Sequence, residues 1–243
     1  MRKLSAIFSI LFATAVLAQT SADDIARRTV SKLAPKWDDA RYIAFTFDVE
    51  RDGKIVASFP QRWDRYTGDY RVSGKDREGN DLLVIMNVNT KTGKGWKGGV
   101  EVADPKDLLT FGYRRFINDT YWLLMGAKAL DPGVHRELAP ARTDAGHAQD
   151  VVKLWFDPGV GLTPADVYWM VVNHDTGLVD EWDMKLTGSK PEDEPSVVLF
   201  HDYRNFGGLL NLSTQREMKG KNQWIKLDDI TVSHEVPKDA FTK

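Results

Sequence analysis

The chain has 243 residues, of which 42% are hydrophobic and 28% are charged, so it can bury a core and is not intrinsically disordered. It contains no cysteine, which excludes disulfides, thiol nucleophiles, cysteine-ligated zinc and a lipid-modified cysteine. A formal net charge of −2 gives no support for nucleic-acid binding through bulk charge.

The N-terminus has the pattern of a cleavable secretory signal. Arg2 and Lys3 supply its positive charge, and the apolar stretch 4–17 is shorter than the roughly 20 residues of a membrane-spanning helix. Val16 and Ala18 suit the small-residue positions before a signal peptidase site, so 1–18 is the predicted signal. We expect a mature chain of residues 19–243, in the periplasm or otherwise secreted, with no stable membrane span. A retained N-terminal anchor is the alternative.

A helix and then a series of strands are predicted next. Residues 23–33 form a helix capped by Asp23 or Asp24, which ends before Pro35. Alternating apolar and polar residues predict a strand over 41–50. Asp52-Gly53 is a hairpin turn, after which the chain returns. The further strand segments of this half are 55–66, 70–72 and 81–88, and the stretch 90–99 around Trp96 is rich in glycine and lysine.

The middle of the chain carries the strongest helix start. Asp104 is a good N-cap and Pro105 suits the first helical position, so a helix is predicted to residue 116 or 117. Asn118-Asp119 is predicted to break this helix. The aromatic segment 121–125 is then favoured as a strand.

The second half of the chain returns to strands joined by short turns. The predicted segments are 151–156, 166–172, 178–186, 197–205, 209–219 and 223–232. No alternating βαβ pattern is present, so about ten or eleven strands should form an antiparallel sheet. We therefore predict a single α+β domain with a strongly curved sheet covered by helices. Apolar residues stand at odd-numbered positions up to Leu227 and at even-numbered positions from Ile230 onward. This change predicts a β-bulge at Asp228-Asp229.

No catalytic or metal motif is visible in the sequence. The five histidines lack zinc-site spacing, and neither a nucleophile elbow nor a phosphate loop is present, so no metal or cofactor is predicted. His201 and Tyr203 are predicted to share one face of a strand. His201 could contact a ligand there, or act with Tyr203 and a nearby acid. A satisfied core or interface histidine is the alternative.

One block of sequence resembles a known family. Residues 118–125 (Asn-Asp-Thr-Tyr-Trp-Leu-Leu-Met) and Asp131-Pro132-Gly133-Val134 resemble a group of uncharacterised bacterial exported proteins, which is similar to the LolA/LolB lipoprotein-carrier superfamily. The resemblance implies a half-open antiparallel barrel whose helices cover an apolar cavity for lipids or lipidated proteins. The chain departs from this pattern in lacking the anchoring cysteine of LolB-type members, and in having Gly126 where a proline often follows.

Tryptophans on predicted strands are the candidate cavity lining. The expected apolar lining, with His201 and Tyr203 beside it, is Trp63, Trp122, Trp155, Trp169 and Trp182. Arg62, Arg65 and Arg71 are candidates to meet a head group; the first two lie in the region where LolA carriers hold their closed state with an arginine. An ordinary aromatic core and solvated arginines are the alternatives.

The favoured function is an exported, non-covalent carrier or binding protein for a lipid-like or lipidated hydrophobic ligand. The partner is then a hydrophobic small molecule or a lipidated protein, and the oligomeric state is open. The alternatives are a hydrolase on the same scaffold and an envelope module that binds another protein through an exposed strand edge.

Overall fold

The computed structural model describes residues 20–243, so the predicted signal and its cleavage site lie outside the described residues. The helices in this range are α1 (Ala22–Leu33), η1 (Trp37–Asp39), α2 (Lys106–Leu124) and η2 (Met125–Lys128), of which η1 and η2 are 3₁₀ helices. None of them combines the length and the apolar character that crossing a bilayer requires. The first strands are β1 (Tyr42–Arg51), β2 (Lys54–Asp64), β3 (Asp69–Lys75), β4 (Asp81–Asn87), β5 (Thr92–Lys97) and β6 (Val100–Glu101). The remaining strands are β7 (Val134–Asp144), β8 (His147–Phe156), β9 (Val167–Asn173), β10 (Val179–Lys185), β11 (Ser196–Phe206), β12 (Leu210–Met218) and β13 (Gln223–Ser233).

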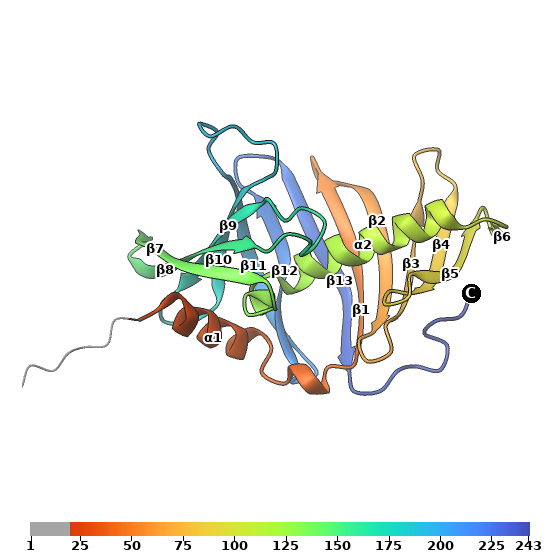
Figure 1. The fold of residues 1–243 in the computed structure, drawn as a ribbon, viewed down its shortest axis with the longest axis horizontal. Helices are drawn as coiled ribbons and strands as arrows, with labels where there is room; N and C mark the ends of the chain where they lie inside the picture. The colour runs from red at the N-terminus through yellow and green to blue at the C-terminus, as the bar shows by residue number, and fades with distance from the viewer. Residues whose placement is uncertain (1–19) are drawn as a thin grey trace, which may run out of the picture.

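All strands of residues 20–243 join one open antiparallel sheet of 13 strands, in the order β6-β5-β4-β3-β2-β1-β13-β12-β11-β10-β9-β8-β7. Two meanders, β1–β6 and β7–β13, meet where β1 pairs with β13. Helix α2 connects the meanders and runs across one face of the curved sheet, while α1 lies along its β7–β8 end (Figure 1). The predicted curved antiparallel sheet covered by helices is confirmed. The strand number was underestimated because β6 has two residues, and β5 and β7 are mostly exposed, so none of the three shows an apolar rhythm.

Helix α1 lies where the sequence predicted it but has a different cap. Ser21 is the N-cap, and its hydroxyl accepts from the backbone N–H of Asp24 at 3.1 Å. The Asp24 carboxylate in turn accepts from the backbone N–H of Ser21, which completes a capping box. The predicted cap at Asp23 or Asp24 was wrong by two or three positions.

Helix α2 contradicts the predicted break at Asn118-Asp119 and the strand over 121–125. It is continuous from Lys106 to Leu124. The helix continues because the Asp119 side chain is buried and paired with Arg115 one turn earlier, so it does not compete for the backbone. Asp104 does not cap this helix, whose N-cap is Pro105. It pairs with Lys106 at 3.3 Å instead.

The buried residues form two clusters on the face that α2 covers. One cluster lies between α2 and the strands β1–β4, β12 and β13, and includes Phe45, Phe47 and Tyr70. The other lies between β8–β11, α1 and η2, and includes Trp182 and Met170. Trp122 packs against both clusters, so the C-terminal part of α2 bridges the two halves of the sheet.

The predicted bulge in β13 is confirmed. The β1–β13 register shifts between Ala44 and Thr46, and Asp229 has a φ of 51°. The extra residue returns Ile230 and Val232 to the first cluster after Leu227. The Asp229 carboxylate accepts from the Thr46 hydroxyl at 3.1 Å, which helps to hold the irregular backbone in place.

Gly112 sets how closely α2 approaches the sheet. A Cβ at Gly112 would lie 2.8 Å from a methyl group of Val84 on β4 and 3.2 Å from the sulfur of Met86. We expect Gly112→Leu to lower the free energy of unfolding by about 1–3 kcal/mol through overpacking, despite better helix propensity. Urea unfolding checks this, with Thr110→Leu on the exposed side of the same helix as the control. Equal stability of the two variants would contradict the prediction.

Candidate functional site

A largely apolar cavity of about 560 Å³ lies beside the C-terminal half of α2. Its walls come from α2 and η2 on one side, and from β8, β9, β10 and the loop 157–166 on the other. The aromatic lining is Trp63, Phe116, Tyr121, Trp122, Phe156 and Tyr168. Leu162 and Leu186 also line it and are 47% and 44% exposed, so they mark its mouth. Concave sites of this volume and composition suit hydrophobic ligands.

Polar groups at the cavity are mostly engaged with one another. The Asp166 carboxylate accepts from the hydroxyls of Tyr168 at 2.9 Å and Thr163 at 2.6 Å, and from the backbone N–H of Thr187 at 2.7 Å. Burial alone would raise the pKa of Asp166, but these hydrogen bonds outweigh it and hold the pKa below its usual value. Lys128 forms an ion pair with Asp131. Among the residues that line the cavity, Lys128 carries the positive charge, and its side chain is 35% exposed.

Trp63 and Trp122 line this cavity, although Trp122 lies on α2 and not on a strand as predicted. The Trp63 ring meets the Phe116 ring edge-on, with 5.0 Å between centroids. Trp182 lies behind the wall and is 0% exposed. Its ring lies 5.8 Å from that of Tyr168 and 6.5 Å from that of Tyr121, which places it as support for two lining residues.

Trp155 and Trp169 face the other side of the sheet. The strand neighbours of these two residues belong to the second cluster: Leu154 precedes Trp155, and Tyr168 and Met170 flank Trp169. Because successive side chains of a strand point to opposite faces, Trp155 and Trp169 point away from that cluster. Trp155 stacks on His135, with 5.4 Å between centroids. The structure therefore does not bring the five tryptophans together at one cavity.

His201 and Tyr203 lie apart, contrary to the predicted shared face. His201 pairs with Glu217 at 3.0 Å, and its ring lies 5.5 Å from that of Trp224. Tyr203 packs against the second cluster, and its hydroxyl donates to the carbonyl of Val179 at 2.9 Å. Between them Asp202 has a φ of 54°, so the strand does not alternate regularly here. The geometry gives no support for joint acid–base chemistry by this pair.

The three arginines predicted to meet a head group donate to backbone carbonyls instead. Arg62 donates to Ala240 at 3.1 Å, and Arg71 donates to Thr242 at 3.2 Å. Arg65 donates to Trp37 at 2.7 Å and Ala40 at 2.6 Å, and its guanidinium lies 3.4 Å from the centre of the Trp37 ring. Burial lowers the pKa of Arg65 and of Arg71. These side chains fasten η1 and the segment 239–243 to the sheet.

Arg216 is a buried cation that sequence reasoning missed. It lies on β12, is 2% exposed, and donates to the carbonyl of Ser213 at 2.8 Å and to that of Trp122 at 3.3 Å. Its guanidinium lies 3.9 Å from the centre of the Phe200 ring. Burial lowers the pKa of Arg216 to about 10. Arg216 thereby ties the cavity-lining end of α2 to the sheet.

A second buried polar group joins α2 to β2 and β3. The Asp119 carboxylate accepts from the Nε of Arg115 at 2.8 Å and also from Gln61, whose side-chain oxygen accepts from the hydroxyl of Tyr70. Burial raises the pKa of Asp119 to about 6, although Arg115, Asn118 and Gln61 act to lower it. Arg115 and Asp119 are four residues apart, and this spacing on a helix is the signal in the sequence from which the pair could have been predicted.

The described residues contain no group of three or more His, Asp or Glu side chains placed to hold a metal ion. Sequence reasoning also missed most of the true lining. Phe116, Tyr121, Phe156 and Tyr168 carry no local mark that separates them from ordinary core aromatics, because the cavity arises from the distant segments 157–166 and 116–128.

Comparison with solved structures supports the architecture. A LolA superfamily protein from Nitrosomonas europaea covers 93% of this chain and 99% of its own, with 10% identity and a TM-score of 0.53. A DUF1329 family protein from Desulfovibrio piger covers 90% of this chain and 94% of its own, with 14% identity and a TM-score of 0.50. No protein-family model and no curated protein matches the sequence. The structural likeness spans nearly the whole described chain, and the protein therefore has the LolA/LolB-like fold that its Asn118–Val134 region suggested.

Proposed function

We propose that this protein is an exported, non-covalent carrier or binding protein whose apolar cavity holds the hydrophobic part of a lipid or a lipidated protein. The observation that carries the proposal is the cavity of about 560 Å³ between α2 and β8–β10, with exposed leucines at its mouth. The fold shared with a LolA superfamily protein supports the same conclusion. The signal-like N-terminus supports action in the periplasm.

Burial of apolar surface supplies the affinity in this proposal. Each methylene group that moves from water into the cavity contributes about 0.8 kcal/mol. Six aromatic side chains line the cavity. The Asp166 carboxylate already accepts hydrogen bonds from Thr163, Tyr168 and Thr187, so it is not free to bind a polar group of the ligand. Lys128 at the rim is the residue placed to meet an anionic head group, at the expense of its pairing with Asp131.

A charge at the mouth of the cavity tests the proposal. We expect Leu162→Asp to weaken binding of a fluorescent fatty acid at least about tenfold, because each bound chain would pass a carboxylate in an apolar rim. Leu138→Asp is the matched control, since Leu138 is 42% exposed on β7 and does not line the cavity, whereas Leu162 is 47% exposed. Titration by fluorescence anisotropy measures both variants.

Native mass spectrometry after mild extraction provides the second measurement. The proposal predicts co-purified lipid with the wild type and much less with Leu162→Asp. A wild-type protein that carries no lipid and shows no thermal shift across fatty acids, phospholipids and lipopeptides would contradict the carrier function.

A further inference from the structure

One hydroxyl group of the apolar cavity beside α2 is left without a hydrogen-bond partner. The cavity is lined by the hydroxyl groups of Thr120, Tyr121, Thr163 and Tyr168. Thr120 donates to the carbonyl of Phe116 at 2.7 Å. Thr163 and Tyr168 both donate to the Asp166 carboxylate. The Tyr121 hydroxyl has no such partner within residues 20–243, so it stays available to a ligand.

The Tyr121 hydroxyl faces the interior of the cavity. The indole N–H groups of Trp63 and Trp182 also lack partners in the described part of the chain, but both nitrogen atoms are fully enclosed. The Tyr121 oxygen is not enclosed in this way, and its side chain is half-buried. Burial nevertheless raises the pKa of Tyr121 well above its usual value. A hydroxyl that is accessible and yet poorly solvated faces an enclosed space and not bulk water.

The Tyr121 ring is held in place before any ligand binds. Its centroid lies 5.9 Å from that of Tyr168 and 6.5 Å from that of Trp182. The carbonyl of the next residue, Trp122, accepts from Arg216 at 3.3 Å, which fixes this part of α2 to the sheet. Because the donor is ordered in advance, less of the hydrogen-bond energy is lost to immobilising it on binding.

The charges that act on this hydroxyl are those of acidic groups. Tyr168, Asp131 and Asp166 all act to raise the pKa of Tyr121. Asp166 is ionised at neutral pH, because its hydrogen bonds hold its pKa below the usual value. A second anion beside the hydroxyl would be repelled by Asp166, and poor solvation strengthens that repulsion. A neutral acceptor pays no such cost.

We propose that the Tyr121 hydroxyl donates a hydrogen bond to a neutral acyl carbonyl oxygen, so that the preferred ligand is an acyl ester or amide and not a free fatty acid. Its hydrocarbon chain lies along the apolar lining towards Trp63 and Phe116, whose rings meet edge-on. The head group beyond the carbonyl lies at the rim, where Lys128 is 35% exposed. This inference rests on the proposed carrier function and names the chemical class of its ligand.

Removal of the hydroxyl alone tests this role. The ligands are methyl laurate, N-methyl lauramide and the alkane of equal length, each measured by displacement of a bound fluorescent hydrocarbon. We expect Tyr121→Phe to weaken binding of the ester, the amide or both about threefold to tenfold, because one neutral hydrogen bond is lost, and to leave alkane binding unchanged. The ligand that loses affinity identifies the linkage. Tyr113→Phe is the matched control, since Tyr113 is half-buried on the same helix and does not line the cavity.

A second variant tests the charge argument. The wild type should bind methyl laurate more tightly than laurate, partly because an ester is the more apolar of the two. Asp166→Asn should narrow this difference at least about threefold, because it removes the negative charge beside the hydroxyl and keeps an oxygen acceptor. A ratio of ester to laurate affinity that is the same in Asp166→Asn would overturn the preference for a neutral carbonyl.

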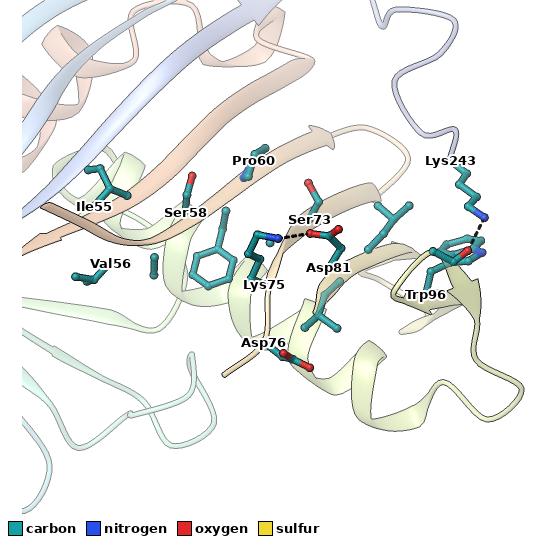
Figure 2. A pocket seen from close by; sticks show the side chains of 16 residues that line it. Ile55, Val56, Ser58, Pro60, Ser73, Lys75, Asp76, Asp81, Trp96 and Lys243 are labelled. Carbon is teal, nitrogen blue, oxygen red and sulfur yellow. Dashed lines mark hydrogen bonds and ion pairs between the residues drawn. The ribbon is translucent and has the colours of Figure 1, made fainter. Parts of the chain in front are cut away.

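A second hollow has to be distinguished from this cavity. It has a volume of about 640 Å³, lies beside β2 and β3, and shares no lining residue with the cavity (Figure 2). Its Lys75 pairs with Asp81 at 2.6 Å and offers a positive charge to the polar end of an acyl ligand. Lys75→Gln should leave the binding of every ligand unchanged. A loss with Lys75→Gln but not with Tyr121→Phe would place the ligand in the second hollow and overturn the proposal.

Failure of this inference and failure of the carrier function give different results. If neither the alkane nor the carbonyl ligands bind the wild type, the carrier function fails and the role of Tyr121 with it. If all of them bind, and Tyr121→Phe weakens none of them or weakens the alkane as much as the ester and the amide, the carrier function stands and the role of Tyr121 is overturned.

Discussion

Replacing Asp119 with alanine is expected to lower the free energy of unfolding by about 3–5 kcal/mol at neutral pH. The reason is that Arg115 and Gln61 both donate to this carboxylate, whose side chain is 0% exposed. Removal of the carboxylate leaves the Arg115 guanidinium, itself only 19% exposed, without its counter-charge between α2 and the sheet. Urea unfolding followed by tryptophan fluorescence measures the loss.

The pH dependence of stability distinguishes the charge of Asp119 from its shape. The pKa of Asp119 is raised from 3.8 to about 6 in the folded protein, so the folded state binds this proton more tightly than the unfolded chain does. The stabilisation from this proton is fully present below about pH 4 and is lost as the pH rises through about 6. Asp119→Asn removes this titration and keeps an oxygen acceptor for Arg115.

We therefore expect the wild type to gain stability relative to Asp119→Asn as the pH falls from about 6 to about 4. Arg27→Gln is the control for the loss of an ion pair at the protein surface, because Arg27 pairs with Asp24 on the exposed side of a helix. A stability difference between wild type and Asp119→Asn that stays constant between pH 4 and 6 would contradict the assignment of a raised pKa.

The fold could be predicted to a large extent from local patterns. Alternating apolar residues in residues 41–50 and the turn at Asp52-Gly53 define neighbouring strands without distant information. The parity change across Asp228-Asp229 even located a bulge that the structure contains. Features of this kind depend on residues close in sequence, so one chain suffices to detect them.

The cavity could not be predicted in the same way, because its lining depends on which face of each strand α2 covers. Residues 166–172 are apolar on both faces, so the sequence does not distinguish Tyr168, which lines the cavity, from Trp169, which faces away. The break predicted at Asn118-Asp119 failed for a related reason. The partner Gln61 that helps to make Asp119 acceptable inside the protein lies 58 residues earlier in the chain.

Replacing Trp182 with alanine is the second change with a large expected effect. Trp182 is 0% exposed and contacts the rings of Tyr168, Tyr121 and Phe200. Its removal leaves a void that the surrounding strands cannot fill, so we expect a loss of about 3–5 kcal/mol in the free energy of unfolding. The same change should loosen Tyr121 and Tyr168, which line the apolar cavity in front of it.

Trp169→Ala supplies the matched control, since Trp169 lies on the neighbouring strand β9 but is half-buried on the other face. We expect it to lose only about 1 kcal/mol. Trp182→Phe should fall between the two, because it keeps an aromatic ring and removes a buried indole N–H that has no partner among the described residues. Chemical denaturation of the three variants checks this order. Equal losses of unfolding free energy for Trp169→Ala and Trp182→Ala would show that the two faces of the sheet are equally well packed. That result would contradict the assignment of the main core to the face that α2 covers.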